Sequence, residues 1–136
     1  MRCSHLNKRN SNLSFVRTYG NLTEVMMDHK LASLGDAYIN FVHSLALSCK
    51  KSAPSGAKVK GKMLAEALRR TGLREFLPSR MTRHKLSDAA EAILVYGWLQ
   101  NFVTLEESIL TMVNAEDITE GLSQLLEKSK KRIKFS

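Results

Sequence analysis

The sequence of 136 residues has little of what cross-links a chain, interrupts its helices or places it in a membrane. Its two cysteines are too few, and too far apart, for a disulfide framework or a zinc site. With two prolines and a hydrophobic content of 43%, the chain is expected to be ordered and rich in helix. No apolar run reaches the roughly 18 residues of a membrane span, and no signal-peptide core follows Met1. These absences favour a reduced, cytoplasmic protein that does not enter a membrane.

Motifs for nucleotide cofactors and for covalent catalysis are also missing. The sequence has no P-loop, no glycine-rich dinucleotide motif and no paired nucleophile and base, so no nucleotide cofactor is expected. The length suits one domain with a sizeable core. The net charge of +8 favours a polyanionic partner such as nucleic acid, although solubility alone would also explain it.

Residues 31–41 predict a helix that carries a narrow polar line. Apolar side chains recur at helical spacing and predict one buried stripe, formed by Leu31, Leu34, Tyr38, Phe41 and Leu45. Asp36, Asn40 and His43 fall outside that stripe. Gly35 is about 1 kcal/mol worse than a good helix former, so we expect a second helix or a partner chain to approach its backbone. The alternative is that Asp36 belongs to an ordinary solvated face.

A second acidic segment opens the helix that we expect from about Leu86 to Phe102. Its residues 92–99 are apolar on every face, which is typical of a central core helix. Ser87 is a candidate N-cap, so Asp88 also fits the first turn of a helix, where an acid is stabilised. Glu91 lies one turn deeper, and a buried carboxylate there must be paired, protonated or bound to a metal ion. The aromatic residues Tyr96 and Trp98 are expected in the core or in a dimer interface.

Together these segments resemble a known family. Leu34-Gly-Asp-Ala37 and Asp88-Ala-Ala-Glu91-Ala-Ile93 resemble the two signature segments of the ribonuclease III endonuclease domain, and residues 57–68 are similar to its intervening helix. The resemblance covers roughly residues 21–113. It implies an all-α, single-domain helical bundle that forms a two-fold homodimer. It also implies a compact, stand-alone member, Mini-III-like or of the archaeal type, without a double-stranded-RNA-binding domain.

The resemblance further implies an endonuclease site built from carboxylates. Asp36, Asp88 and Glu91 would be the catalytic residues and the ligands of Mg²⁺ or Mn²⁺, with Asn40 as a supporting group. Carboxylate oxygens suit these ions. The sequence departs from the classical family at Ala32, where a Glu is expected. Asp28 could replace that group or be a plain surface acid.

A basic edge is the candidate RNA-binding surface. We expect a helix from about Ser55 to Thr71, ending on Gly72, with Lys58, Lys62 and Arg69 along one face and Lys60 nearby. These side chains could follow a phosphate backbone or form an ordinary solvated face. Two capping boxes, at residues 104–107 and 117–120, predict two further helices. His84 is read as a surface residue without a catalytic role.

The domain organisation that we expect has three parts: a polar, basic extension over residues 1–18, a ribonuclease III-like helical domain over residues 19–127 and a basic tail over residues 128–136. The expected function is Mg²⁺-dependent hydrolysis of phosphodiester bonds in double-stranded or structured RNA. One alternative is a catalytically impaired relative that binds RNA or a ribosomal assembly. Another is a helical dimer with no RNA role.

Overall fold

The computed structural model of the chain describes residues 13–135, and residues 1–12 of the expected N-terminal extension lie outside that range. The described residues form six α-helices and one short 3-10 helix, without a β-strand, so the predicted all-α class is confirmed. In chain order, these elements are α2 (Leu22–Met26), α3 (His29–Lys51), α4 (Gly61–Arg70), η2 (Leu73–Phe76), α5 (Arg83–Leu99), α6 (Leu105–Asn114) and α7 (Ile118–Arg132). Within the described range, none of these helices is long and apolar enough to cross a membrane.

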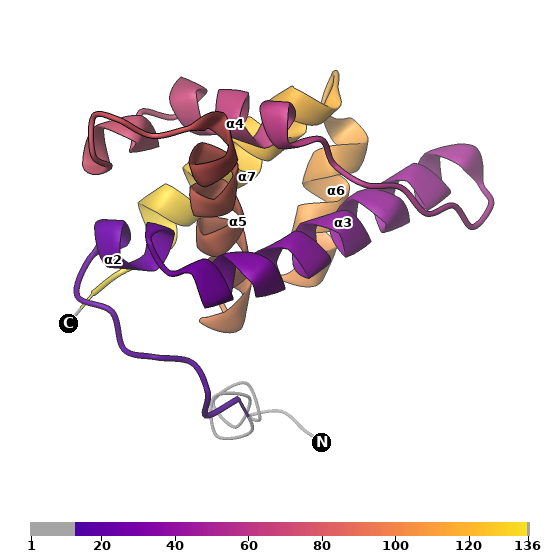
Figure 1. The fold of residues 1–136 in the computed structure, drawn as a ribbon. Helices are drawn as coiled ribbons and strands as arrows, with labels where there is room; N and C mark the ends of the chain where they lie inside the picture. Colours follow the sequence, from indigo (N-terminus) through magenta and orange to yellow (C-terminus); the bar gives the residue numbers. More distant parts are fainter. Residues whose placement is uncertain (1–12, 136) are drawn as a thin grey trace.

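Helix α5 is the centre of the bundle, as its apolar sequence predicts. It packs against α2, α3, α4 and α7 (Figure 1). Twelve of its 17 residues are buried. Tyr96 is among them, and Trp98 stacks on Tyr38 of α3 with ring centroids 5.4 Å apart. Both aromatic side chains therefore pack within the protein.

Two glycines allow helices to approach α5 closely. A Cβ atom added to Gly35 of α3 would lie 2.1 Å from the carbonyl oxygen of Glu91. A Cβ atom on Gly97 of α5 would lie 3.0 Å from the hydroxyl oxygen of Ser129 on α7. The predicted close approach at Gly35 is thus made by a second helix of the same chain.

The buried face of α3 differs from the predicted stripe. It is turned around the helix axis, because α5 and α6 cover the side formed by Leu31, Ala32, Gly35, Tyr38, Ile39, Val42, His43 and Ala46. Leu34 and Phe41 were expected inside but are 38% and 54% exposed. His43 was placed on the polar line but is buried. The small residues at positions 32 and 35 let α5 approach there instead.

Helix α4 starts at Gly61, so the helix start predicted at Ser55 is wrong. The segment before it is extended and is held by three polar side chains one turn apart on α3. Ser48 Oγ donates to the carbonyl of Ser55 and accepts from its N–H, and Ser44 Oγ makes the same pair of bonds with Ala57. The Asn40 side chain accepts from the N–H of Val59 at 2.7 Å. These bonds satisfy the backbone without a helix.

The other helix ends follow local capping chemistry. Helix α5 begins at Arg83 with Thr82 as its N-cap, so the expected cap at Ser87 is wrong. The two predicted capping boxes are confirmed in part: Thr104 accepts a hydrogen bond from the N–H of Glu107 and Asp117 accepts one from that of Glu120. Gly72, with φ of 78°, follows α4 as predicted.

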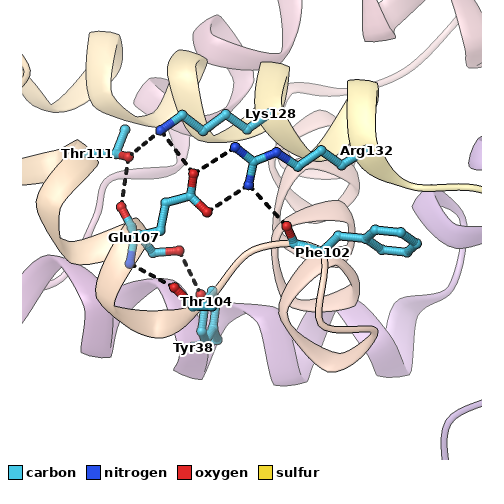
Figure 2. A network of polar contacts seen from close by, with 8 residues as sticks. Tyr38, Phe102, Thr104, Glu107, Thr111, Lys128 and Arg132 are labelled. Carbon is cyan, nitrogen blue, oxygen red and sulfur yellow. Dashed lines mark hydrogen bonds and ion pairs between the residues drawn. The ribbon is translucent and has the colours of Figure 1, made fainter. Parts of the chain in front are cut away.

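Helix α7 continues through the first residues of the expected basic tail. Its basic side chains bind residues of α6. Arg132 makes two hydrogen bonds to the carboxylate of Glu107, at 2.7 and 2.8 Å, and a third to the carbonyl of Phe102 at 3.1 Å. Lys128 lies 3.4 Å from the same carboxylate and donates to the Thr111 hydroxyl (Figure 2). These two cations therefore hold the fold together rather than forming a free tail.

Candidate active site

The three predicted catalytic acids line one cleft. Asp36 projects from α3, whereas Asp88 and Glu91 project from α5, and the segment leading into α4 closes a third side. The cleft has a volume of about 460 Å³. Its other lining residues are His29, Ala32, Ser33, Val59, Gly61, Leu64, His84 and Ser87.

Glu91 is the most unusual acid of the cleft, because its residue is only 6% exposed. Burial raises the pKa of Glu91 to about 8, and a hydrogen bond with Asp36 and the negative charges of Asp36 and Asp88 add to the effect. The protonated Glu91 carboxyl thus donates to the carboxylate of Asp36. Two carboxylates in such contact share a proton or a cation, since their charges repel.

Helix geometry brings this pair together. Asp36 follows Gly35, and Gly35 packs directly against the backbone of Glu91. The two helices therefore cross at the two acids. Asp88 lies in the second turn of α5 rather than in its first turn, so it does not serve the helix N-terminus in the way the expected Ser87 cap implied.

Asn40 links Asp36 to the extended segment that precedes α4. Its side-chain amide donates to Asp36 at 3.3 Å, and its oxygen accepts from the N–H of Val59 at 2.7 Å. Asn40 does not line the cleft. It holds the Asp36 carboxylate and the extended segment in a fixed relation to each other.

Three of the four predicted RNA-binding residues lie beside the cleft, and the fourth lies farther away. Lys58, Lys60 and Lys62 are exposed and alternate with Val59 and Gly61, which face the cleft. Lys58 and Lys60 stand on the extended segment, not on a helix as predicted. The fourth predicted residue, Arg69, sits at the far end of α4, 3.6 Å from the carboxylate of Glu66.

Asp28 does not replace the missing family Glu. It is the N-cap of α3, accepts from the N–H groups of Lys30 and Leu31, and accepts from the Tyr19 hydroxyl at 2.6 Å. These bonds hold the pKa of Asp28 below its usual range, although partial burial opposes them. Asp28 lines a neighbouring hollow of about 530 Å³, which has only His29 in common with the acidic cleft, whereas Ala32 lines the acidic cleft.

Asp88 has two neighbours that the sequence analysis left out of the site. His29 Nδ1 lies 3.8 Å and His84 Nε2 lies 3.6 Å from the same oxygen, Asp88 Oδ2. His84 could have been found, because it precedes Asp88 by four residues and so shares its face of α5. His29 could not, since it depends on how α3 crosses α5.

The donor set fits a hard divalent cation. Within residues 13–135, no group of three or more His, Cys, Asp or Glu side chains is placed to hold a metal ion. Mg²⁺ does not require one, because it is usually held by one or two carboxylates, several waters and substrate phosphates. The paired carboxylates of Asp36 and Glu91 beside an open cleft suit that mode of binding.

A comparison with known protein families matches residues 29–134 to the family described as Ribonuclease III. The chain belongs to the ribonuclease III family. The match begins with α3 and extends beyond α7, so this ribonuclease III domain includes every helix that lines the cleft. It also covers most of the segment from residue 128 that was set apart as a tail. A comparison with curated proteins finds no match.

Proposed function

We propose that this ribonuclease III domain is an endoribonuclease of the cytoplasm that hydrolyses phosphodiester bonds in double-stranded or structured RNA. Mg²⁺ or Mn²⁺ would be held by Asp36 and Glu91, with Asp88 as a further acid of the same cleft. The observation that carries the proposal is the hydrogen-bonded pair of Asp36 and Glu91 in a cleft of a ribonuclease III domain.

The acid pair suits a bound divalent cation, whose positive charge would offset the two negative charges. Without a cation, Glu91 stays protonated up to about pH 8, because burial and Asp36 disfavour its charge. A bound divalent ion lowers the pKa of a coordinated water and offsets charge that develops on the scissile phosphate. The hydrogen bond from Asn40 would hold the Asp36 carboxylate in place beside such an ion.

Substrate affinity would come from the basic border of the cleft. Lys58, Lys60 and Lys62 would contact phosphates of the RNA backbone beside the acids, and Arg69 would extend this surface along α4. Duplex RNA is recognised mainly by its shape, its phosphates and its 2′-hydroxyls. Cleavage is therefore expected to depend strongly on salt and weakly on sequence.

A two-fold homodimer would give the enzyme two such clefts, one for each strand. Leu34, Ala37 and Phe41 recur along one face of α3 and are exposed, although two of them are large and apolar. Such a stripe favours burial against a second copy of the chain. Family resemblance implies products with 5′-phosphate and 3′-hydroxyl ends.

Cleavage of a labelled RNA duplex tests the proposal. We expect cleavage with Mg²⁺ or Mn²⁺ and none with EDTA, and we expect Asp36→Asn and Glu91→Gln to abolish it. Glu106→Gln removes an exposed acid from α6 and serves as the control that keeps activity. Cleavage at wild-type rates by both cleft variants would refute the assignment.

One observation favours a second candidate, a catalytically impaired relative that binds RNA or a ribosomal assembly. Ala32 lines the cleft where the classical family has a Glu, so one carboxylate is missing. This candidate predicts duplex binding at low salt without cleavage in any divalent ion. Absence of binding as well would favour a helical dimer with no RNA role.

A further inference from the structure

A small hollow forms where the segment before α2, the end of α5 and the residues after α7 come together. Figure 1 shows the last residues after α7 running past the segment that leads into α2. The volume of about 290 Å³ is just below the roughly 300–1,000 Å³ of sites for drug-sized ligands, so the hollow suits a small group. Two cations line it, Arg17 and Lys134, and no acid among the described residues does. The hollow therefore favours a small anion.

Tyr96 brings a buried hydroxyl group to this hollow. The residue lines the hollow and is only 6% exposed. Its ring packs edge-on against Tyr19 and face to face with Phe135, which fixes its position. Within residues 13–135, the Tyr96 hydroxyl has no hydrogen-bond partner. Because a buried hydroxyl without a partner costs about 1–3 kcal/mol, a ligand or a water is expected to bind it.

The neighbouring side chains show which donors remain for a ligand. The Tyr19 hydroxyl is already used, since it donates to Asp28 at 2.6 Å. Arg17 has five N–H donors and directs one of them to the same carboxylate, at 3.5 Å. Its other donors have no acceptor in the described part of the chain. Burial raises the pKa of Tyr96 above its ordinary value of 10, so its hydroxyl keeps its proton at neutral pH.

Lys134 supplies the second charge of the hollow. It is exposed and has no hydrogen bond or ion pair to any described residue. The other cations of the C-terminal run contact protein acceptors instead: Lys128, Lys130, Lys131 and Arg132. Lys134 is therefore the cation of this run that the fold itself does not use.

The charges of the hollow add up in favour of an anion. The C-terminal end of α5, capped by Gln100, carries about half a negative elementary charge, which opposes one. Asp28 lies outside the hollow and offsets part of the charge of Arg17. The full positive charge of Lys134 outweighs the helix end, and the guanidinium still provides directed donors.

The hollow is separate from the acidic cleft. Gln100 also lines it and follows Asp88 by twelve residues, or about 18 Å along a helix. Tyr96 follows Glu91 by five residues, so the two side chains leave α5 about 140° apart around its axis. A variant in the hollow therefore leaves the acid pair unchanged.

We propose that this hollow binds a phosphate group through Arg17, Lys134 and the Tyr96 hydroxyl. Phosphate oxygens accept hydrogen bonds from all three groups. The phosphate belongs either to the RNA backbone, a source that rests on the proposed function, or to phosphate free in solution, which does not. Residues 16–19 precede the range that matches the ribonuclease III family, so that match does not imply the site.

The experiment titrates the full chain with inorganic phosphate at pH 7, at constant ionic strength and with chloride as the comparison. Nuclear magnetic resonance follows the side-chain amide of Gln100 and the backbone amides of Arg17 and Lys134. The test variants are Tyr96→Phe, which keeps the ring, and Lys134→Gln. The matched control is Lys131→Gln, which removes one positive charge from the same segment but lies outside the hollow.

We expect saturable phosphate shifts in the wild type and in the control. The phosphate affinity should fall about tenfold in Tyr96→Phe, which loses a hydrogen bond to a charged group, and about two- to fivefold in Lys134→Gln. The melting temperature of Tyr96→Phe without phosphate should not fall, because its hydroxyl has no partner among the described residues. Equal shifts with chloride and phosphate would overturn the proposal. So would wild-type phosphate affinity in Tyr96→Phe, or equal losses in Lys134→Gln and Lys131→Gln.

Binding of a labelled RNA duplex in EDTA distinguishes the two sources. If the phosphate belongs to RNA, both test variants bind the duplex more weakly than the control does, and inorganic phosphate competes with it. Equal duplex affinities assign the hollow to free phosphate.

Cleavage in Mg²⁺ is measured separately, so that the two proposals can fail independently. A protein that cleaves RNA without specific phosphate shifts refutes the hollow alone. A protein with those shifts that cleaves no RNA in any divalent ion retains the phosphate site and loses the nuclease assignment.

Discussion

Gly35 and the backbone of Glu91 are in direct contact, so that a single added methyl group would lie 2.1 Å from the Glu91 carbonyl oxygen. The contact has a functional consequence, because Gly35 precedes Asp36 in the chain. The same close crossing of α3 and α5 that needs a glycine also brings the carboxyl groups of Asp36 and Glu91 within hydrogen-bonding distance. The packing of α3 on α5 and the pairing of the two acids therefore both depend on the glycine at position 35.

Gly35→Ala is expected to destabilise the protein and to impair cleavage together. Alanine favours an ordinary helix by about 1 kcal/mol over glycine. Here the added Cβ overlaps backbone, which cannot rotate away, so a net loss of about 1–3 kcal/mol is expected. Thermal unfolding measures the loss. Gly56→Ala is the control, since no atom lies within 4 Å of its added Cβ. Equal melting temperatures for the two variants would contradict this account.

Glu91→Gln is expected to stabilise the metal-free protein at pH 8 while it abolishes cleavage. The pKa of Glu91 is raised from 4.5 to about 8, chiefly by burial. Folding therefore favours the protonated form, and stability is lost as the pH rises from about 4.5 to 8. Glutamine stays neutral and can still donate to Asp36. Since a tenfold shift in a proton equilibrium is worth about 1.4 kcal/mol, the gain at pH 8 should be a few kcal/mol.

The pH dependence separates this effect from a general improvement in packing. At pH 5 the carboxyl of Glu91 is protonated in the folded protein, so the stability advantage of Glu91→Gln should be much smaller there. Denaturant unfolding in EDTA at pH 5, 6.5 and 8 measures the difference. A constant advantage over that range would show that the charge of Glu91 is not its cause.

Features that rest on one helix could be predicted from the sequence. Thr104 and Asp117 cap their helices because the side chain and the N–H it binds are three residues apart. The apolar run within α5 predicted its central place in the bundle, and Gly35 predicted a close approach. Each of these depends on neighbours in the sequence or on a single missing side chain.

Features that depend on contacts between distant segments could not be predicted from the sequence. Ser55 is a good N-cap by its residue type, but Ser48 on α3 takes both of its backbone groups and keeps the segment extended. The buried face of α3 is set by where α5 and α6 dock, which left Phe41 outside. The convergence of His29 and His84 on Asp88 likewise depends on the crossing of two helices.

Leu34→Asp and Phe41→Asp are expected to convert the proposed dimer to a monomer. Both side chains lie on the exposed apolar stripe of α3, where a buried charge in an interface would be costly. Their exposure in the single chain means that its own fold should tolerate the change. Sedimentation and circular dichroism measure the two effects separately. Leu110→Asp is the control, because this leucine is 58% exposed but stands on α6. A wild-type sedimentation coefficient for both stripe variants would exclude this face as the interface.

Glu107→Gln is expected to destabilise the protein at neutral pH by about 1–2 kcal/mol, because it removes the charge from the hydrogen bonds that join α6 to α7. Partial exposure of the Arg132 side chain limits the effect. Hydrogen bonds from Arg132 hold the pKa of Glu107 below its ordinary value of 4.5, although burial opposes them. The stabilisation is therefore complete above pH 4.5 and is lost as the pH falls through the lower pKa of the folded protein.

Urea unfolding of the wild type and of Glu107→Gln, measured from pH 7 down to pH 3, tests this assignment. The loss of unfolding free energy should be largest at neutral pH and should shrink toward zero in acid, and its sign is opposite to that of the change expected for Glu91→Gln. Glu106→Gln changes the adjacent exposed acid and should differ little from wild type at any pH. If Glu106→Gln costs as much as Glu107→Gln, general charge on α6 stabilises the helix pair, and the specific bond to Arg132 does not.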